Sequence, residues 1–249
     1  MWTVDQIRAL AGDGYVVVAK VVPASLCDLA LARIDALLEA TPPPAGQPGH
    51  NYWLDTDSEP ELRALLTDSP ALALAEGLTS PRRIARPSFL QVALTFPPYQ
   101  HIPARGHIDG LTPTEPDGRP GTFTLLMGVI LSDQTKPMMG NLIVWPGTHC
   151  PLAVYLRENG PDAILESRGY PPIHHGQPVT VAGDVGDVIF AHYLLSHNSG
   201  GNTSDVVRRT VYFRVKVEGH DGSWRQFVCD ELHDLHAVRA AIQLNRLAT

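Results

Sequence analysis

The stretch RGHIDGL, residues 105–111, contains a histidine and an aspartate one residue apart with glycines on both sides. In an extended segment, residues i and i+2 point to the same side, so His107 and Asp109 can present an imidazole and a carboxylate to one point. Both groups bind transition metals well. Two ligands are too few to hold a metal, and on its own this tripeptide is more typical of a polar turn.

A third ligand has to come from elsewhere in the chain, and residues 186–209 offer one. The stretch reads GDVIFAHYLLSHNSGGNTSDVVRR, in which His197 follows a β-rich segment and a Gly/Asn/Ser turn leads to a pair of arginines. Two histidines and one carboxylate on one face of an octahedron, with the other positions open, is the arrangement of non-haem Fe(II) oxygenases. Together the two segments favour a metal site over a turn.

With these segments the chain resembles the phytanoyl-CoA dioxygenase family of Fe(II)/2-oxoglutarate-dependent oxygenases. The family pattern has His-x-Asp, then a Pro-Gly-Ser-His turn, then a Gly-Asp strand that leads to a second metal-binding histidine and an arginine. The matching pieces here are HID (107–109), GNLIVWPGTH (140–149) and residues 186–209, and GDGYVVVAKVVP (12–23) resembles the family's opening strand. The resemblance implies a double-stranded β-helix, also called a jelly roll, of the cupin-like kind.

The resemblance also implies a ligand set. His107, Asp109 and His197 would bind Fe(II) and so form the catalytic centre. Arg208, eleven residues after His197, would bind the distal carboxylate of the co-substrate 2-oxoglutarate, which a planar guanidinium matches better than an ammonium. Because a carboxylate is present at Asp109, a halogenase, in which a small residue vacates that position, is disfavoured.

Three further residues are candidates for co-substrate binding. Ser199 falls where the family has a serine beside 2-oxoglutarate. Trp145 lies where relatives place an aromatic residue near the co-substrate, with ordinary packing as the alternative. Residues 95–100 lack the lysine that some relatives place near the co-substrate. Gln91 or Thr95 would then take over the role of that lysine.

The neighbouring Arg209 competes with Arg208 for the anchoring role. On a strand, Arg209 shares a face with alternate apolar residues from Val211 to Val217, whereas Arg208 shares a face with Thr210, Tyr212 and Arg214. The apolar face should pack against helices or the opposing sheet. This alternation favours Arg208 as the residue that lines the site, although a polar face can also point to solvent.

The surrounding sequence predicts an α+β fold with a mainly β core and helices packed on its outside. We expect one domain over residues 1–249, with the jelly-roll core at about 88–217, a helical and strand part at 1–87 and a C-terminal helical segment at 218–249. In the first part we expect a helix over 3–12 capped by Thr3, a strand over 15–22, a helix over 25–40 capped by Ser25, a Pro/Gly-rich loop over 41–61 and a helix over 60–77.

Other histidines have simpler interpretations. His149 ends a tight turn and is expected to bond to backbone there, and His192 is expected in the core or behind the metal ligands. His233 and His236 lie three apart on a predicted helix without a nearby third ligand.

Composition limits the classes of partner. The chain has 249 residues and a formal net charge of −7, without a cluster of basic residues, which argues against nucleic acid and against an anionic membrane surface. The three cysteines form no Cys-x-x-Cys pair, so a reducing, cytoplasmic location is expected. We see no signal peptide, and the longest apolar stretch, 124–131, is too short to cross a bilayer.

The resemblance implies a dioxygenase that hydroxylates or otherwise oxidatively tailors a small molecule, using O2 and releasing succinate and CO2. A site for a CoA thioester normally contains a cluster of basic residues that binds its phosphates, and the chain has no such cluster. We therefore favour a small, largely apolar or zwitterionic metabolite, such as an intermediate of natural-product biosynthesis. Two alternatives stay open: a metal-dependent jelly-roll enzyme that does not use 2-oxoglutarate, and a non-catalytic jelly-roll binding module. The sequence does not indicate the oligomeric state or choose among oxidative outcomes.

Overall fold

The computed structural model of the protein describes residues 1–112 and 114–247. The helices are α1 (Val4–Asp13), α2 (Ala24–Ala40), α3 (Pro60–Thr67), α4 (Ala71–Thr79), α5 (His149–Asn159), α6 (Ala163–Glu166), α7 (His220–Cys229) and α8 (His236–Leu247). The strands are β1 (Tyr15–Val18), β2 (Gly49–Asp55), β3 (Ile84–Ala85), β4 (Phe89–Thr95), β5 (Leu125–Ile130), β6 (Leu142–Val144), β7 (Val179–Thr180), β8 (Val188–His192), β9 (His197–Ser199) and β10 (Arg208–Val217).

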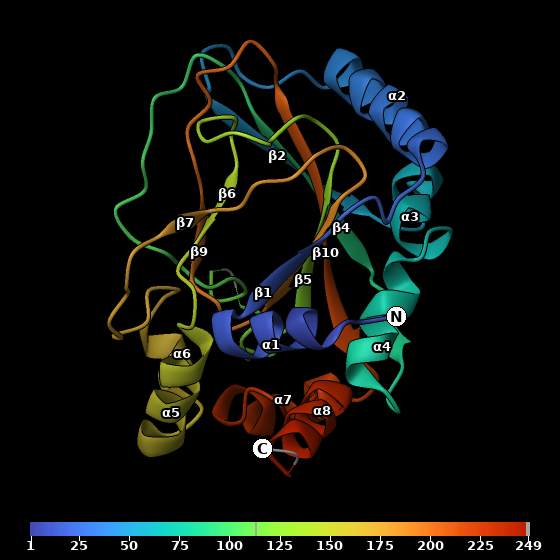
Figure 1. Ribbon diagram of the computed structural model, residues 1–249. Coiled ribbons are helices and arrows are strands. Elements are labelled where there is room, and N and C mark those ends of the chain that lie inside the picture. Colours follow the sequence, from blue (N-terminus) through green and yellow to red (C-terminus); the bar gives the residue numbers. More distant parts are fainter. Residues whose placement is uncertain (113, 248–249) are drawn as a thin grey trace.

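The strands form two antiparallel sheets that face each other (Figure 1). The larger sheet has the order β1-β8-β5-β10-β4-β2, with β3 also paired to β10, and the smaller sheet has the order β7-β6-β9. Among the described strands, none is paired to both sheets, so the two do not close into a continuous barrel. The predicted α+β class with a jelly-roll core is confirmed.

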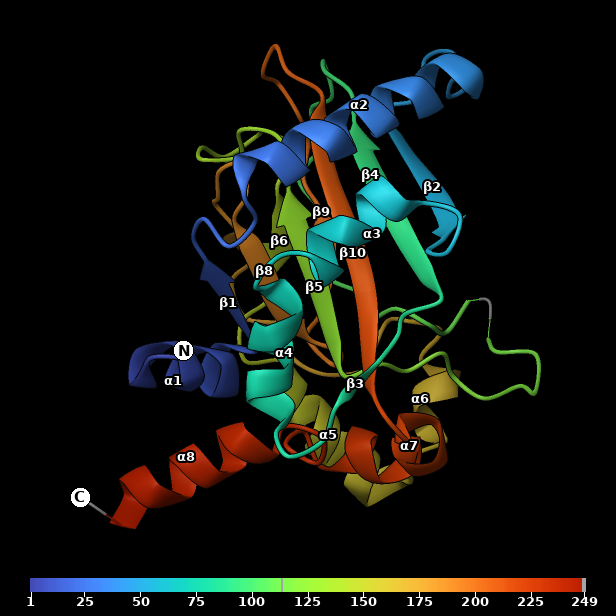
Figure 2. The ribbon, with the colours of Figure 1, turned by 90° about the vertical axis from the view of Figure 1, so that its right-hand side faces the viewer.

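Helices cover the outer face of the larger sheet, as Figure 2 shows for α2, α3 and α4. Leucines and isoleucines of α1, α2 and α3 pack there against alternate residues of β4, β5, β8 and β10. Because side chains alternate along a strand, the remaining residues of these strands face inward, toward the smaller sheet. Inward-facing Leu126, Ile130 and Tyr212 join Leu142 and Val144 of β6 in a second apolar cluster.

Strand β10 separates these two environments residue by residue. Val211, Phe213, Val215 and Val217 are fully buried against the helical layer, whereas Tyr212 belongs to the inner cluster. The expected alternation of the two faces is therefore confirmed. Arg209 follows the outer face and pairs with Asp35 of α2, with a guanidinium-to-carboxylate distance of 2.7 Å. Arg208 faces inward.

The first 87 residues correct several expectations. Thr3 caps α1 in a capping box, as expected, but α2 begins after Pro23 without a side-chain cap, so Ser25 lies inside the helix. Pro70 splits the expected helix over 60–77 into α3 and α4, because a proline disfavours helical backbone in the residue before it and lacks an N–H group.

The expected loop over 41–61 contains β2, an edge strand paired with β4 from Gly49↔Thr95 to Asp55↔Phe89. Its burial alternates only weakly, with Tyr52 as its one buried residue, so the strand does not stand out from the Pro/Gly-rich segment before it. Tyr52 and Trp53, which fall within the expected loop over 41–61, are residues of this strand.

Helices α5, α6 and α7 lie at one end of the sandwich (Figure 1). The sequence did not predict α5 and α6, whereas α7 lies in the expected C-terminal helical segment over 218–249. The buried apolar residues of α5 and α7 belong to the inner cluster: Leu152, Ala153, Leu156, Trp224, Phe227 and Val228. No helix in the described residues is long and apolar enough to cross a membrane.

Candidate metal centre

The backbone brings the two candidate histidine ligands together. His107 and His197 form a β-bridge in which each N–H donates to the other residue's carbonyl oxygen, both at 2.9 Å. Residues directly opposite each other in an antiparallel pair point to the same side. Asp109, two residues further along an extended segment, points to that side too, while Ile108 is 2% exposed and packs into the inner cluster.

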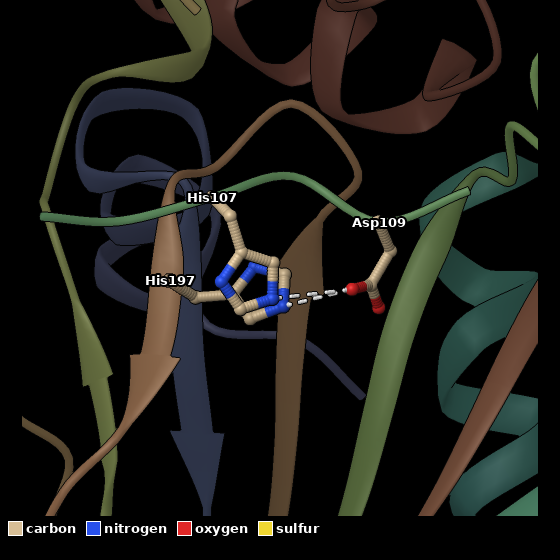
Figure 3. A group of neighbouring side chains, drawn as sticks. All are labelled: His107, Asp109 and His197. Atoms are coloured by element: carbon tan, nitrogen blue, oxygen red, sulfur yellow. Dashed lines mark ion pairs between the residues drawn. The ribbon is translucent and has the colours of Figure 1, made fainter. Parts of the chain in front are cut away.

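The three side chains converge on one point (Figure 3). The Nε2 atoms of His107 and His197 lie 3.5 and 3.6 Å from Oδ1 of Asp109. Candidate ligand atoms of all three residues lie within 4.8 Å of one another, and no other such group of three occurs in residues 1–112 and 114–247. Nδ1 of His197 donates to the Leu195 carbonyl oxygen at 3.0 Å, which leaves the Nε2 lone pair free for a metal.

Arg214 binds Oδ2 of Asp109, the carboxylate oxygen that does not face the histidines. Its guanidinium donates twice to Oδ2 of Asp109, at 2.6 and 3.1 Å, and once to Oε1 of Gln91 at 2.9 Å. Arg214 therefore engages Oδ2 and leaves Oδ1 facing the histidines. Because Arg214 lies six residues after Arg208 on the same inward face of β10, strand alternation already placed it there, although the sequence did not indicate its partner.

The charges within this group favour an ionised carboxylate. Burial alone would raise the pKa of Asp109, but the charges of His197 and Arg214 and hydrogen bonds from both histidines hold it well below its usual range. Burial would likewise lower the pKa of His197, but the neighbouring Asp109 raises it. Two imidazoles and an anionic carboxylate that face one point suit a divalent metal such as Fe(II), which would compete with protons for the same atoms.

Glycines beside the ligands permit close approach of the chain to itself. A Cβ on Gly106 would lie 2.6 Å from the Trp145 ring and 2.8 Å from Ser196. Gly110 has φ +76°, and a Cβ there would lie 2.1 Å from the carbonyl oxygen of Gly121. The atoms for which these two glycines make room therefore belong to the protein itself.

Arg208 is a buried cation, 2% exposed. Its guanidinium donates to the Tyr212 hydroxyl at 2.7 Å and to the Ala93 carbonyl at 3.3 Å, while its Nε has no hydrogen-bond partner. No carboxylate of the described residues pairs with it, although buried guanidinium groups usually have an anionic partner. Gly128, opposite Tyr212 on β5, makes room for the tyrosine ring, since a Cβ there would lie 2.6 Å from it.

Three neighbouring cavities surround these groups. The three candidate ligands, Gln91, Ser199 and Tyr212 line a cavity of about 150 Å³. Arg208 lines a second cavity of about 250 Å³, which shares Asn51, Asn198 and Ser199 with the first. His107, Asp109, Gln91 and Arg214 also line a third and larger cavity of about 710 Å³.

Trp145 does not line any of these cavities. It is 3% exposed and packs beneath Gly106 and against His175, with ring centroids 5.9 Å apart. The structure therefore brings Ser199 and Gln91 beside the candidate ligands but leaves Trp145 behind them. Asn51 lines all three cavities from strand β2. No motif in the sequence indicated Asn51 as a site residue.

His192 and His149 are not part of this group. His192 is buried in the core, where Nε2 donates to the Glu231 carbonyl oxygen at 2.8 Å. His149 begins α5 and donates through Nε2 to the Ala11 carbonyl oxygen at 3.2 Å, so its side chain bonds to the backbone of α1 and not to the expected turn.

Comparison with known proteins gives one family and a set of similar folds. A family model described as phytanoyl-CoA dioxygenase (PhyH) matches residues 10–210. No curated protein sequence matches the chain. The carbocyclase SnoK from nogalamycin biosynthesis, a non-heme alpha ketoglutarate dependent enzyme, superposes with a TM-score of 0.60 at 19% identity, over 88% of this chain and 85% of that chain.

Two further solved structures are similar. HygX from Streptomyces hygroscopicus, with nickel and 2-oxoglutarate bound, has a TM-score of 0.60 at 18% identity and covers 87% of both chains. The epimerase SnoN, in complex with Fe3+, alpha ketoglutarate and nogalamycin RO, has a TM-score of 0.57 at 21% identity, over 85% of this chain and 82% of that chain. At these low sequence identities, the structural similarity shows a shared fold.

Proposed function

Because the chain belongs to the phytanoyl-CoA dioxygenase family, we propose that His107, Asp109 and His197 hold its Fe(II) and that Arg208 anchors its 2-oxoglutarate. The protein is a non-haem iron oxygenase that uses 2-oxoglutarate to oxidise a small molecule. The outcome proposed for this chain is hydroxylation or a related oxidative tailoring step.

The observation that carries the assignment of the metal is the convergence of two imidazole nitrogens and one carboxylate oxygen, with Oδ1 of Asp109 3.5 and 3.6 Å from the two Nε2 atoms. When bound, Fe(II) and 2-oxoglutarate supply the activation of O2 that oxidises a C–H bond, with release of succinate and CO2. With three protein ligands, a bound Fe(II) would have further positions open for the co-substrate and O2.

The residues of the chain orient and shield this chemistry. Arg214 holds Oδ2 of Asp109, so the carboxylate keeps one oxygen toward the histidines. The buried Arg208 supplies a planar fork for a carboxylate and has an unpartnered Nε, which supports a binding role for an anion in the adjoining cavity. Ser199 lines both smaller cavities and is proposed to contact the co-substrate between them. Gln91 positions Arg214, and we assign no co-substrate contact to Trp145.

Anaerobic titration tests the proposal. Protein reconstituted with one equivalent of Fe(II) should develop a metal-to-ligand charge-transfer absorption band when 2-oxoglutarate is added, and should release succinate once O2 is admitted. Succinate would form slowly without substrate and faster with it.

The same titration separates the two alternative functions. Bound iron without a charge-transfer band would identify a metal-dependent enzyme that does not use 2-oxoglutarate. Protein that binds neither iron nor 2-oxoglutarate would be a binding module, and either result would contradict the proposed function.

A further inference from the structure

The large cavity in front of the candidate ligands has an aromatic wall. Trp53 of β2 and Phe89 of β4 line it and are 58% and 61% exposed, an unusual exposure for side chains of this size. Trp53 lies opposite Gln91 in the register of these strands and Phe89 lies opposite Asp55, so the two rings are diagonal neighbours on the inner face of the sheet.

The Trp53 ring contacts a side chain of the candidate metal centre. The Arg214 guanidinium lies 4.6 Å from the centroid of the Trp53 ring and 5.8 Å from that of Phe123. Because Arg214 is bonded to Asp109 and Gln91, it ties the tryptophan ring to the metal centre. An apolar group that packs on the aromatic wall would therefore lie beside the candidate iron ligands.

The acidic and basic side chains that line the cavity take part in ion pairs. Arg214 pairs with Asp109, and Lys216 pairs with Glu115 at 3.6 Å and with Asp221 at 2.8 Å. A charged substrate would have to break one of these pairs to be neutralised, whereas a neutral molecule would leave them in place. The other polar lining groups, Asn51 and the hydroxyls of Thr112 and Thr114, suit hydrogen bonds to neutral oxygen atoms.

We propose that the substrate is a neutral small molecule with a flat apolar ring system, which stacks on Trp53 and Phe89 to present a C–H bond to the metal. The volume of about 710 Å³ fits a molecule of two to four rings with room for polar substituents. This inference rests on the proposed function of the metal centre. It disfavours polycationic substrates and acyl-CoA thioesters, because the cavity has no unpaired acidic or basic cluster for them.

Binding of neutral ring probes tests this inference. We expect flavanone or 1-naphthol to bind the Fe(II)- and 2-oxoglutarate-loaded protein under anaerobic conditions, and to quench tryptophan fluorescence. Kanamycin, a polycation, and palmitoyl-CoA, an anionic acyl chain, should bind at least about tenfold more weakly.

Variants identify the surface involved. Trp53→Leu, which keeps apolar area but removes the aromatic face, should weaken binding of the ring probes by about tenfold in a titration calorimeter, and Trp53→Phe should restore most of it. Leu244→Ala removes an exposed apolar side chain of α8, 68% exposed, and should leave binding unchanged.

Two outcomes overturn the inference. Neither ring probe binds a protein whose charge-transfer band is intact, or kanamycin or palmitoyl-CoA binds more tightly than both. Loss of the charge-transfer band itself would instead count against the proposed metal centre, so the two failures are distinguishable.

Discussion

At the scale of residues, Arg208 and Arg214 lie on the same face of β10 but have different roles. Arg214 engages Oδ2 of Asp109 and so acts on a candidate ligand of the metal, whereas Arg208 is buried with an unpartnered Nε and bonds only neutral groups. Arg209, between them, faces the other way and pairs with Asp35. The two inward-facing arginines therefore belong to the candidate site, whereas the outward-facing Arg209 joins the sheet to α2.

This difference predicts unequal effects on 2-oxoglutarate affinity. Arg208→Ala should raise the dissociation constant of 2-oxoglutarate at least about thirtyfold, since loss of a buried charge-assisted pair costs about 2 to 5 kcal/mol. Arg209→Ala, the matched control, should change it by less than about twofold. The constant is measured from the charge-transfer band, and equal effects of the two substitutions would refute the assignment.

At the scale of elements, the sequence was informative where residue types and strand alternation agree. The two faces of β10 follow from strand alternation, whereas the roles of the His-x-Asp segment and of the second histidine follow from the resemblance to the family pattern. Strand β2 could not be predicted, because an edge strand has one pairing neighbour and only Tyr52 of it is buried. As a result Asn51 and Trp53, which shape the site from β2, were missed or misplaced, and Arg214's partner could not be known without the fold.

The turn after Asp109 should be sensitive to an added methyl group. Gly110→Ala combines a left-handed backbone at φ +76° with a contact of 2.1 Å to the Gly121 carbonyl oxygen. Gly118→Ala has a similar φ, +82°, but open space around its Cβ. Urea unfolding should show Gly110→Ala to be less stable than Gly118→Ala by about 1 to 3 kcal/mol. Equal stability of the two variants would mean that the turn relaxes freely.

At the scale of the whole molecule, buried neutral histidines join the helical end of the sandwich to its core. His149 and His192 have ring centroids 5.1 Å apart and are 1% and 2% exposed. Burial lowers the pKa of His149 to about 4 and that of His192 to about 3. In the unfolded chain the pKa of both side chains would be about 6.5.

The protein should therefore lose stability in mild acid. Above pH of about 6.5 both histidines are neutral in both states, and below it only the unfolded chain takes up the protons, so stability falls as the pH drops toward 4. Between pH 7.5 and 5, protonation of His149 in the unfolded chain should by itself lower the free energy of unfolding by about 2 kcal/mol. His149→Gln should reduce that loss in urea unfolding, whereas the exposed His174→Gln should not. The same pH dependence in both variants would contradict this account.

The central claim is that His107, Asp109 and His197 form one iron site, and the iron content of purified variants tests it most directly. Anaerobically reconstituted wild-type protein should retain one Fe(II) per chain after desalting. His107→Ala and His197→Ala should retain almost none while unfolding at a temperature close to that of the wild type, and His174→Ala, a control outside the site, should retain one. A folded His107→Ala or His197→Ala protein that keeps a full equivalent of Fe(II) would contradict the claim.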